Sequence, residues 1–178
     1  MSATTQEQQG QRSATEERVR KVWAEVFVDK DLSKASEWWS DDSTDEFLAL
    51  GLTARGATEL TAFFRELFDA VPDIEMRIEH IVADDTTRHA VLQWHFTGTT
   101  NGKPFQGIEP PAGKRLDLRG CDVFQLDEDG RVLTNTIYYD GAEFARQIGM
   151  LPPRDSALDR SMVAGFNAVT RLRTKLNR

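Results

Sequence analysis

The sequence predicts an α+β fold, in which helices pack on one side of a curved antiparallel sheet. Apolar residues recur with a period near 3.6 as far as Pro72, and from Asp73 the period changes to two. Helical spacing returns after the segment MLPPRDS. A chain of 178 residues fits one domain with tails. We therefore expect a disordered, polar leader over residues 1–13, one domain over 14–153 and an amphipathic helical extension over 154–178.

Three helices are expected in the first part of the chain. Ser13 and Glu16 form the S-x-x-E pattern of a capping box, and helical spacing continues from there to about Val28. A shorter helix is expected around residues 31–39, followed by a brief strand within EFLALGL at 46–52. The third helix lies within residues 55–73, where a Phe-rich apolar stripe is ended by Pro72.

Strands are expected in the second part. From Ile74 apolar and charged residues alternate, and His80 continues the apolar series. A long strand follows over residues 88–98, and the Gly- and Pro-rich segment 98–114 indicates a rim loop. Two further strands, at about 115–126 and 131–139, are joined through a turn at Asp129 and Gly130.

The expected C-terminal helix is amphipathic. Its apolar residues step by three or four and are interspersed with basic ones: Leu158, Met162, Phe166, Val169, Leu172 and Leu176. This pattern is typical of a helix that packs against its own domain or a sister subunit. A basic membrane-surface helix is the alternative, and we favour packing because no second membrane signal accompanies the helix.

Composition excludes several classes of function. A formal net charge of -7 gives no basis for binding a phosphate backbone, so nucleic acid is not an expected partner. The one cysteine, Cys121, rules out an internal disulfide, and no signal peptide or membrane-spanning run is apparent. We expect a cytoplasmic protein. Walker, dinucleotide-binding, nucleophile-elbow and paired-cysteine metal motifs are missing, so no cofactor or metal is expected.

Asp122 is the first candidate for chemistry. In its strand, one alternation holds Leu116, Leu118, Gly120, Asp122, Phe124 and Leu126. Asp122 therefore falls on the buried face, where a carboxylate needs partners or takes up a proton. It is either a buried structural acid, satisfied by backbone donors, Asn135 or a histidine, or a general acid or base in a pocket. The sequence favours neither.

Other polar and apolar side chains could complete such a pocket. Asn135, Ile137 and Tyr139 share one face of the last strand, whose mixed polar and apolar character suits a ligand cavity or a subunit interface. Gln93 and His95 share a face of an earlier strand, where His95 is a candidate base or a half-exposed histidine without a role. Trp23, Phe64 and Phe124 are the apolar candidates for substrate contact.

The chain also resembles a known family, on three stretches between about Arg18 and Pro153. They are FFRELFDAVPDIEMRIEHIVADD, LQWHFTGTTNGKPFQGIEPPAGKRLDL and FQLDEDGRVLTNTIYYDGAEFARQIGMLPP. The most specific features are the Pro-Asp that ends a Phe-rich helix, the Gly-Thr-x-x-Gly loop with a later Pro-x-Gly-Lys, and the closing Gln-Ile-Gly. Together they resemble the SnoaL-like polyketide cyclases.

This resemblance implies a cone-shaped α+β fold, similar to nuclear transport factor two and ketosteroid isomerase. The N-terminal helices would close a curved sheet over a deep apolar pocket, and family members are often homodimers. It also implies a ring-closing aldol step without a cofactor, with an acidic residue on the last strand and a histidine on the strand before it. Limonene-type epoxide hydrolases place an acid at the same position on the last strand.

The sequence departs from that pattern at both positions. Counting from the Gln-Ile-Gly and Asp-Gly anchors, the acid falls on Ile137 and the histidine on Asp122, and Thr100 replaces a loop histidine. Our leading hypothesis is therefore a cyclase or isomerase acting on an apolar oxygenated metabolite, with Asp122 as acid/base, supported by His95, Asn135 and Tyr139. A non-catalytic ligand-binding or dimerisation module is the rival, and an epoxide hydrolase or cofactor-free hydroxylase is a third hypothesis.

Overall fold

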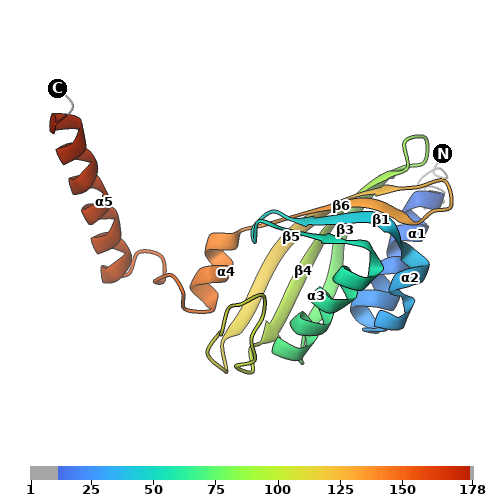
Figure 1. Cartoon of the computed structure of the whole chain (residues 1–178), viewed down its shortest axis with the longest axis horizontal. Coiled ribbons are helices and arrows are strands. Elements are labelled where there is room, and N and C mark those ends of the chain that lie inside the picture. Colours follow the sequence, from blue (N-terminus) through green and yellow to red (C-terminus); the bar gives the residue numbers. More distant parts are fainter. Residues whose placement is uncertain (1–11, 177–178) are drawn as a thin grey trace, which may run out of the picture.

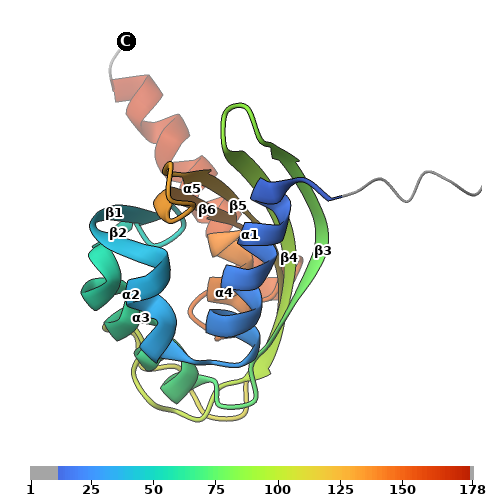
Figure 2. The same ribbon diagram turned by 90° about the vertical axis from the view of Figure 1, so that its right-hand side faces the viewer.

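The computed structural model describes residues 12–176. Six strands form one curved, open sheet in the order β2-β1-β6-β5-β4-β3. Helices cover its concave side, and the last helix stands apart (Figures 1 and 2). The predicted α+β class is confirmed. All neighbouring strands pair antiparallel except β1 and β6, which run parallel, so the expectation of a wholly antiparallel sheet was wrong for this pair.

The N-terminal helices begin and end as their capping residues dictate. Helix α1 (Ala14–Trp23) starts where Ser13 Oγ accepts a hydrogen bond from the Glu16 amide at 3.1 Å, and a π-helical turn (Ala24–Val28) follows. The expected second helix consists of a 3-10 turn (Leu32–Lys34) and the single turn α2 (Ala35–Trp38). Ser13 thus caps the helix, and the rest of the expected leader, apart from Arg12, lies outside the described residues.

Strands β1 (Trp39–Phe47) and β2 (Leu52–Arg55) replace the single brief strand expected at 46–52. They form a hairpin whose turn covers most of that segment. The run DDSTD resembles a loop in composition, yet it alternates: Ser43, Asp45 and Phe47 are buried, and polar neighbours face outward. Helix α3 (Gly56–Ala70) follows as predicted, with Leu60, Phe63 and Phe64 in the core.

The remaining strands form the broad part of the sheet: β3 (Glu75–Asp84), β4 (His89–Thr99), β5 (Arg115–Leu126) and β6 (Val132–Tyr139). A register shift between Ile78 and His80 reverses the alternation in β3, so His80 is exposed and Ile81 turns inward. The prediction that His80 continues the apolar face was therefore wrong. The rim loop contains a bridge between Phe105 and Ile108.

Two helices follow the sheet. The short helix α4 (Gly141–Gln147) was not predicted, and Asp140 caps it by accepting a hydrogen bond from the Glu143 amide at 2.9 Å. Helix α5 (Ala157–Leu176) is the predicted amphipathic extension. It projects away from the domain (Figure 1), and its apolar side chains are exposed: Leu158, Met162, Val163, Phe166, Val169 and Leu172. Within residues 12–176, no helix has the length and apolar character needed to cross a membrane.

Candidate active site

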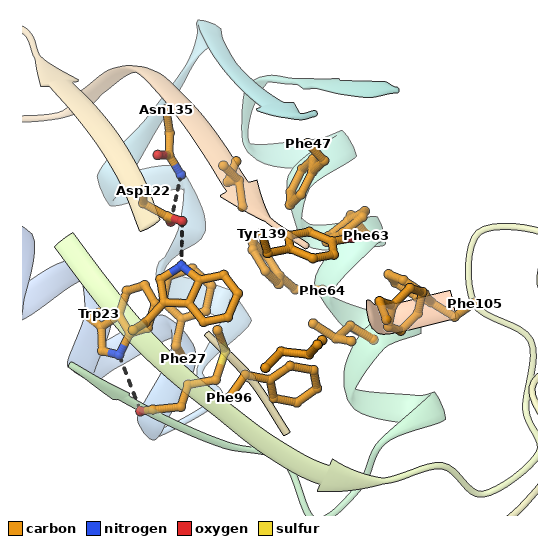
Figure 3. Close-up of a pocket in the computed structure, with 16 residues that line it drawn as sticks. Trp23, Phe27, Phe47, Phe63, Phe64, Phe96, Phe105, Asp122, Asn135 and Tyr139 are labelled. Carbon is orange, nitrogen blue, oxygen red and sulfur yellow. Dashed lines mark hydrogen bonds between the residues drawn. The ribbon is translucent and has the colours of Figure 1, made fainter. Parts of the chain in front are cut away.

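A cavity lies between the concave face of the sheet and the helices. It encloses about 630 Å³, counting the space that opens to solvent. Its walls are almost entirely aromatic and aliphatic, as is typical of sites for small apolar ligands. The lining residues are Trp23, Phe27, Phe47, Phe63, Phe64, Leu67, Met76, Trp94, Phe96, Phe105, Leu118, Asp122, Asn135, Ile137, Tyr139 and Phe144 (Figure 3).

Asp122 is the acid of this cavity. It lies on β5, faces inward as its alternation predicts, and is only 3% exposed. Its Oδ1 accepts a hydrogen bond from Trp94 Nε1 at 2.7 Å, and its Oδ2 accepts one from Asn135 Nδ2 at 3.2 Å (Figure 3). The carboxyl group is therefore held by two side chains from the neighbouring strands β4 and β6.

Gly120 makes the bond from Trp94 possible. Gly120 and Trp94 are directly paired across β5 and β4. A Cβ atom at residue 120 would overlap the Trp94 ring and would lie 2.6 Å from the Tyr138 carbonyl oxygen. Because glycine has no Cβ, the indole can lie across β5 and direct its N–H toward Asp122.

A second buried acid, Asp45, belongs to the same network. It is 2% exposed, accepts a hydrogen bond from Trp39 Nε1 at 2.8 Å, and accepts another from Asn135 Nδ2 at 3.1 Å. Asp45 was not predicted as a site residue, because it lies in the polar run that resembles a loop. Its position two residues from Phe47, in alternation with it, was the signal that could have found it.

Burial changes the acidity of both carboxyl groups. Desolvation raises the pKa of Asp122 to about 6, although the bonds from Trp94 and Asn135 oppose the rise. Desolvation also raises the pKa of Asp45 to about 7, opposed by Asn135 and Trp39 and reinforced by the charge of Asp122. Near neutral pH, Asp122 is therefore poised between accepting and releasing a proton.

Tyr139 adds a polar group to the same cavity. Burial raises the pKa of its phenol to about 12, so the hydroxyl group stays protonated and can donate a hydrogen bond at neutral pH. Asn135, Ile137 and Tyr139 all face inward from β6 and line the cavity, as their shared alternation predicts. Trp23 and Phe64 line it as well.

The structure separates the other predicted residues from Asp122. His95 does not line the cavity: its Nε2 lies 2.7 Å from Asp117 Oδ1, and its Nδ1 lies 2.8 Å from Arg77 Nη2. Because guanidinium can only donate, Nδ1 must accept and Nε2 must carry the proton toward Asp117. His95 thus joins β3, β4 and β5, and the expectation that it supports Asp122 was wrong.

Gln93 and Phe124 also lie outside the cavity wall. Gln93 is exposed, on the opposite side of β4 from Trp94. Phe124 faces inward but is packed in the core, with 1% of its surface exposed. Alternation along a strand predicts which residues share a face, but it cannot say how far along that face a cavity extends.

No group of three metal-binding side chains that could hold an ion is present in the described part of the chain. The sequence profile of the SnoaL-like polyketide cyclases matches residues 17–148. The chain belongs to this family. No curated protein matches the chain.

Solved structures share the fold of this SnoaL-like protein. A protein from Jannaschia sp. CCS1, provisionally described as a SnoaL-like polyketide cyclase, is 24% identical, with a TM-score of 0.67, over 80% of this chain and 99% of that one. AclR from Streptomyces galilaeus, provisionally described as a hydroxylase, is 17% identical, with a TM-score of 0.65, over 90% of this chain and 98% of AclR. A protein from Catenulispora acidiphila with a ketosteroid isomerase-like fold, in complex with trimethylamine, is 13% identical, with a TM-score of 0.60, over 76% of this chain and 97% of that one.

Proposed function

We propose that the protein is a cofactor-independent enzyme of cyclase or isomerase type that acts on an apolar, oxygenated, polyketide-like metabolite, with Asp122 as its acid/base. One observation carries this proposal: Asp122 is a poised carboxyl group in the wall of a cavity that is otherwise almost wholly apolar. Such walls favour a substrate with hydrocarbon rings, and the polar groups of Asp122, Asn135 and Tyr139 suit a substrate that carries a carbonyl oxygen.

The reaction begins with proton transfer from carbon. The Asp122 carboxylate removes a proton next to a substrate carbonyl, the C–H electron pair moves into an enolate, and an O–H bond forms on Asp122. The Tyr139 hydroxyl group can donate a hydrogen bond to the enolate oxygen. Returning the proton to another carbon completes an isomerisation. Attack of the enolate carbon on a second carbonyl closes a ring, and Asp122 then protonates the new alkoxide.

The position of Asp122 compensates for the missing acid at residue 137. Asp122 and Ile137 are directly paired across β5 and β6, and both line the cavity. Paired positions on neighbouring strands have Cβ atoms about 5 Å apart. A carboxyl group on Asp122 therefore reaches much of the space that an acid at residue 137 would reach. This pairing supports an acid/base role for Asp122 on β5 in place of an acid at residue 137 on β6.

Hydrogen exchange at carbon tests the proposal before the natural substrate is identified. Aromatic polyketide diketones and steroid ketones are incubated with the protein in D2O, and deuterium incorporation next to the carbonyl is followed by NMR. We expect Asp122→Asn to slow the catalysed exchange by about 100-fold or more. Asp42→Asn is the matched control, because Asp42 is exposed on β1. Exchange at the parental rate in Asp122→Asn would eliminate the proposal.

A non-catalytic ligand-binding role is the second candidate. It is favoured by the apolar residue Ile137 at the position of the family's acid, and by the hydrogen bonds that already occupy both oxygens of Asp122. A lipid or flavonoid that raises the melting temperature and is recovered unchanged supports binding, whereas its conversion supports catalysis. Opening of an epoxide or hydroxylation without a cofactor is a third candidate, and the similarity in fold to AclR favours testing it.

We also propose that the protein is a cytoplasmic homodimer in which α5 packs on a second copy. The exposed apolar side of α5 supports this arrangement, because such surfaces are usually covered in a soluble protein. Charge supports it too: α5 carries Arg160, Arg171, Arg173 and Lys175 against the single acid Asp159, whereas the whole chain has a net charge of -7. The acidic domain of a second copy would attract the basic helix.

A further inference from the structure

Asp45 and Asp122 have matching hydrogen-bond partners. Each accepts one bond from an indole N–H, Trp39 for Asp45 and Trp94 for Asp122. Each also accepts one bond from the same amide nitrogen, Asn135 Nδ2, at 3.1 Å and 3.2 Å. The chain of bonds thus crosses three adjacent strands, from β1 through β6 to β5. Asp122 lines the cavity, whereas Asp45 lies behind Asn135 and does not.

While both carboxyl groups are ionised, this arrangement permits only one orientation of the Asn135 amide. An amide NH2 group has two hydrogens, and each is donated to a different carboxyl group. Turning the amide over would place its oxygen against both carboxyl groups and would lose both bonds. Asn135 Oδ1 is buried and has no hydrogen-bond partner, so Asn135 itself gains nothing at that atom. The two acids therefore hold the orientation of the amide.

Asp45 is costly to the fold. It is 2% exposed, and its carboxylate loses hydration free energy on burial that the hydrogen bonds from Trp39 and Asn135 offset only in part, since burial still raises its pKa to about 7. The unpartnered oxygen of Asn135 adds a further cost. In return, Asp45 directs one N–H of Asn135 toward Asp122 Oδ2. This hydrogen bond and the one from Trp94 together fix the plane of the Asp122 carboxyl group.

We propose that Asp45 is a positioning residue for Asp122, acting through Asn135. It holds the amide so that one N–H meets Asp122 Oδ2, and it thereby sets the direction in which the Asp122 carboxyl group faces the cavity. The catalytic meaning of this role rests on the function proposed above. The interaction itself does not, because it can be measured on the free protein.

The test is the titration of Asp122, followed by NMR of protein labelled with 13C at the aspartate carboxyl groups. The Asp122 signal is the one absent from Asp122→Asn. We expect Asp45→Asn to raise the midpoint of this titration by about one pH unit, because the Asn135 amide turns to pair with the substituted side chain and no longer stabilises the Asp122 carboxylate. Asn135→Ala should give a similar rise. Asp42→Asn should give none, since Asp42 is exposed on the same strand.

The double variant Asp45→Asn with Asn135→Ala decides whether the two residues act together. We expect its Asp122 midpoint to lie no higher than that of Asn135→Ala alone, because without the amide Asp45 can act on Asp122 only through the repulsion between the two carboxylates. Asp45→Leu is a second single variant: it removes the buried charge and both hydrogen-bond acceptors, and it leaves Trp39 Nε1 and Asn135 Nδ2 without this partner. For any ketone that the wild-type protein exchanges, Asp45→Asn should lower kcat about 10-fold and leave KM unchanged.

Two results would overturn the proposal. An unchanged Asp122 midpoint in Asp45→Asn, together with a shift in Asn135→Ala, would mean that Asn135 is held without Asp45. A lowered midpoint would mean that Asp45 acts by its charge rather than by holding the amide. The proposed enzymatic function fails by a separate result, parental exchange in Asp122→Asn, which leaves the titrations of the other variants unaffected.

Discussion

Replacing Asp122 with asparagine should change how the stability of the protein depends on pH. The pKa of Asp122 is raised from 3.8 to about 6 in the folded state, because burial disfavours the charged form. The folded protein thus binds this proton more tightly than the unfolded chain does. The proton stabilises the fold fully below about pH 4, and this stabilisation is lost as the pH rises through about 6.

The raised pKa of Asp122 sets the size of the effect. It corresponds to about 3 kcal/mol between the fully protonated and fully ionised limits, of which about 2 kcal/mol falls between about pH 4.5 and pH 8. Asparagine does not titrate, so Asp122→Asn should gain about this much stability relative to the wild type across that range. Removal of the Asp122 charge also lowers the pKa of Asp45, and this adds to the gain in the same direction.

Urea unfolding of both proteins, followed by tryptophan fluorescence at several pH values, measures this difference. The difference between the two proteins cancels the titration of the shared groups that do not interact with Asp122, and Asp45 is the shared group that still contributes to it. In melting temperature it amounts to about 4–8 °C. Asp42→Asn is the control for the loss of an exposed aspartate. A constant difference between Asp122→Asn and the wild type from about pH 4.5 to pH 8 would refute the reasoning.

Three other variants test separate parts of the structure. Gly120→Ala should lower the free energy of unfolding by about 1–3 kcal/mol, measured by chemical unfolding, because the new methyl group displaces Trp94. It should also raise the Asp122 titration midpoint in 13C NMR, because the hydrogen bond from Trp94 is lost. His95→Ala should lower the free energy of unfolding by about 1–3 kcal/mol and leave the Asp122 titration midpoint unchanged, because it breaks only hydrogen bonds on the outer side of the sheet. A change in that midpoint would contradict the placement of His95 away from Asp122. Phe166→Asp should leave the domain folded, as judged by far-UV circular dichroism, and should shift the protein from dimer to monomer in sedimentation velocity. An unaltered dimer would exclude α5 from the interface.

Periodicity predicted most of the fold because it depends only on local geometry. The stripe that contains Phe63 and Phe64 identified α3, alternation identified β4, β5 and the inward direction of Asp122, and the turn at Asp129 and Gly130 located β6. The same rule failed in β3, where a one-residue bulge at Glu79 reversed the faces of the residues that follow. A bulge leaves no mark in composition, so alternation alone could not reveal it.

The parts that could not be predicted depend on contacts between distant segments. Parallel pairing of β1 with β6 brings Asp45 beside Asn135, yet 90 residues separate them in the chain. Nor does alternation say which side of β4 faces the cavity, because Trp94, His95 and Phe96 are all buried. The prediction that His95 supports Asp122 was wrong for this reason. His95 is buried on the outer side of the sheet by Arg77 and Asp117, which belong to other strands.

The two hydrogen bonds to Asp122 leave its carboxyl group able to accept a proton. A carboxylate has about four lone-pair sites, and Trp94 and Asn135 occupy one on each oxygen. Capacity therefore remains on both oxygens to accept a proton from a guest in the cavity. Burial raises the pKa of Asp122 to about 6 and that of Asp45 to about 7, but of these two acids only Asp122 lines the cavity. In the enzyme proposed above, Trp94 and Asn135 hold the orientation of the Asp122 carboxyl group, and acceptor sites remain free on both of its oxygens.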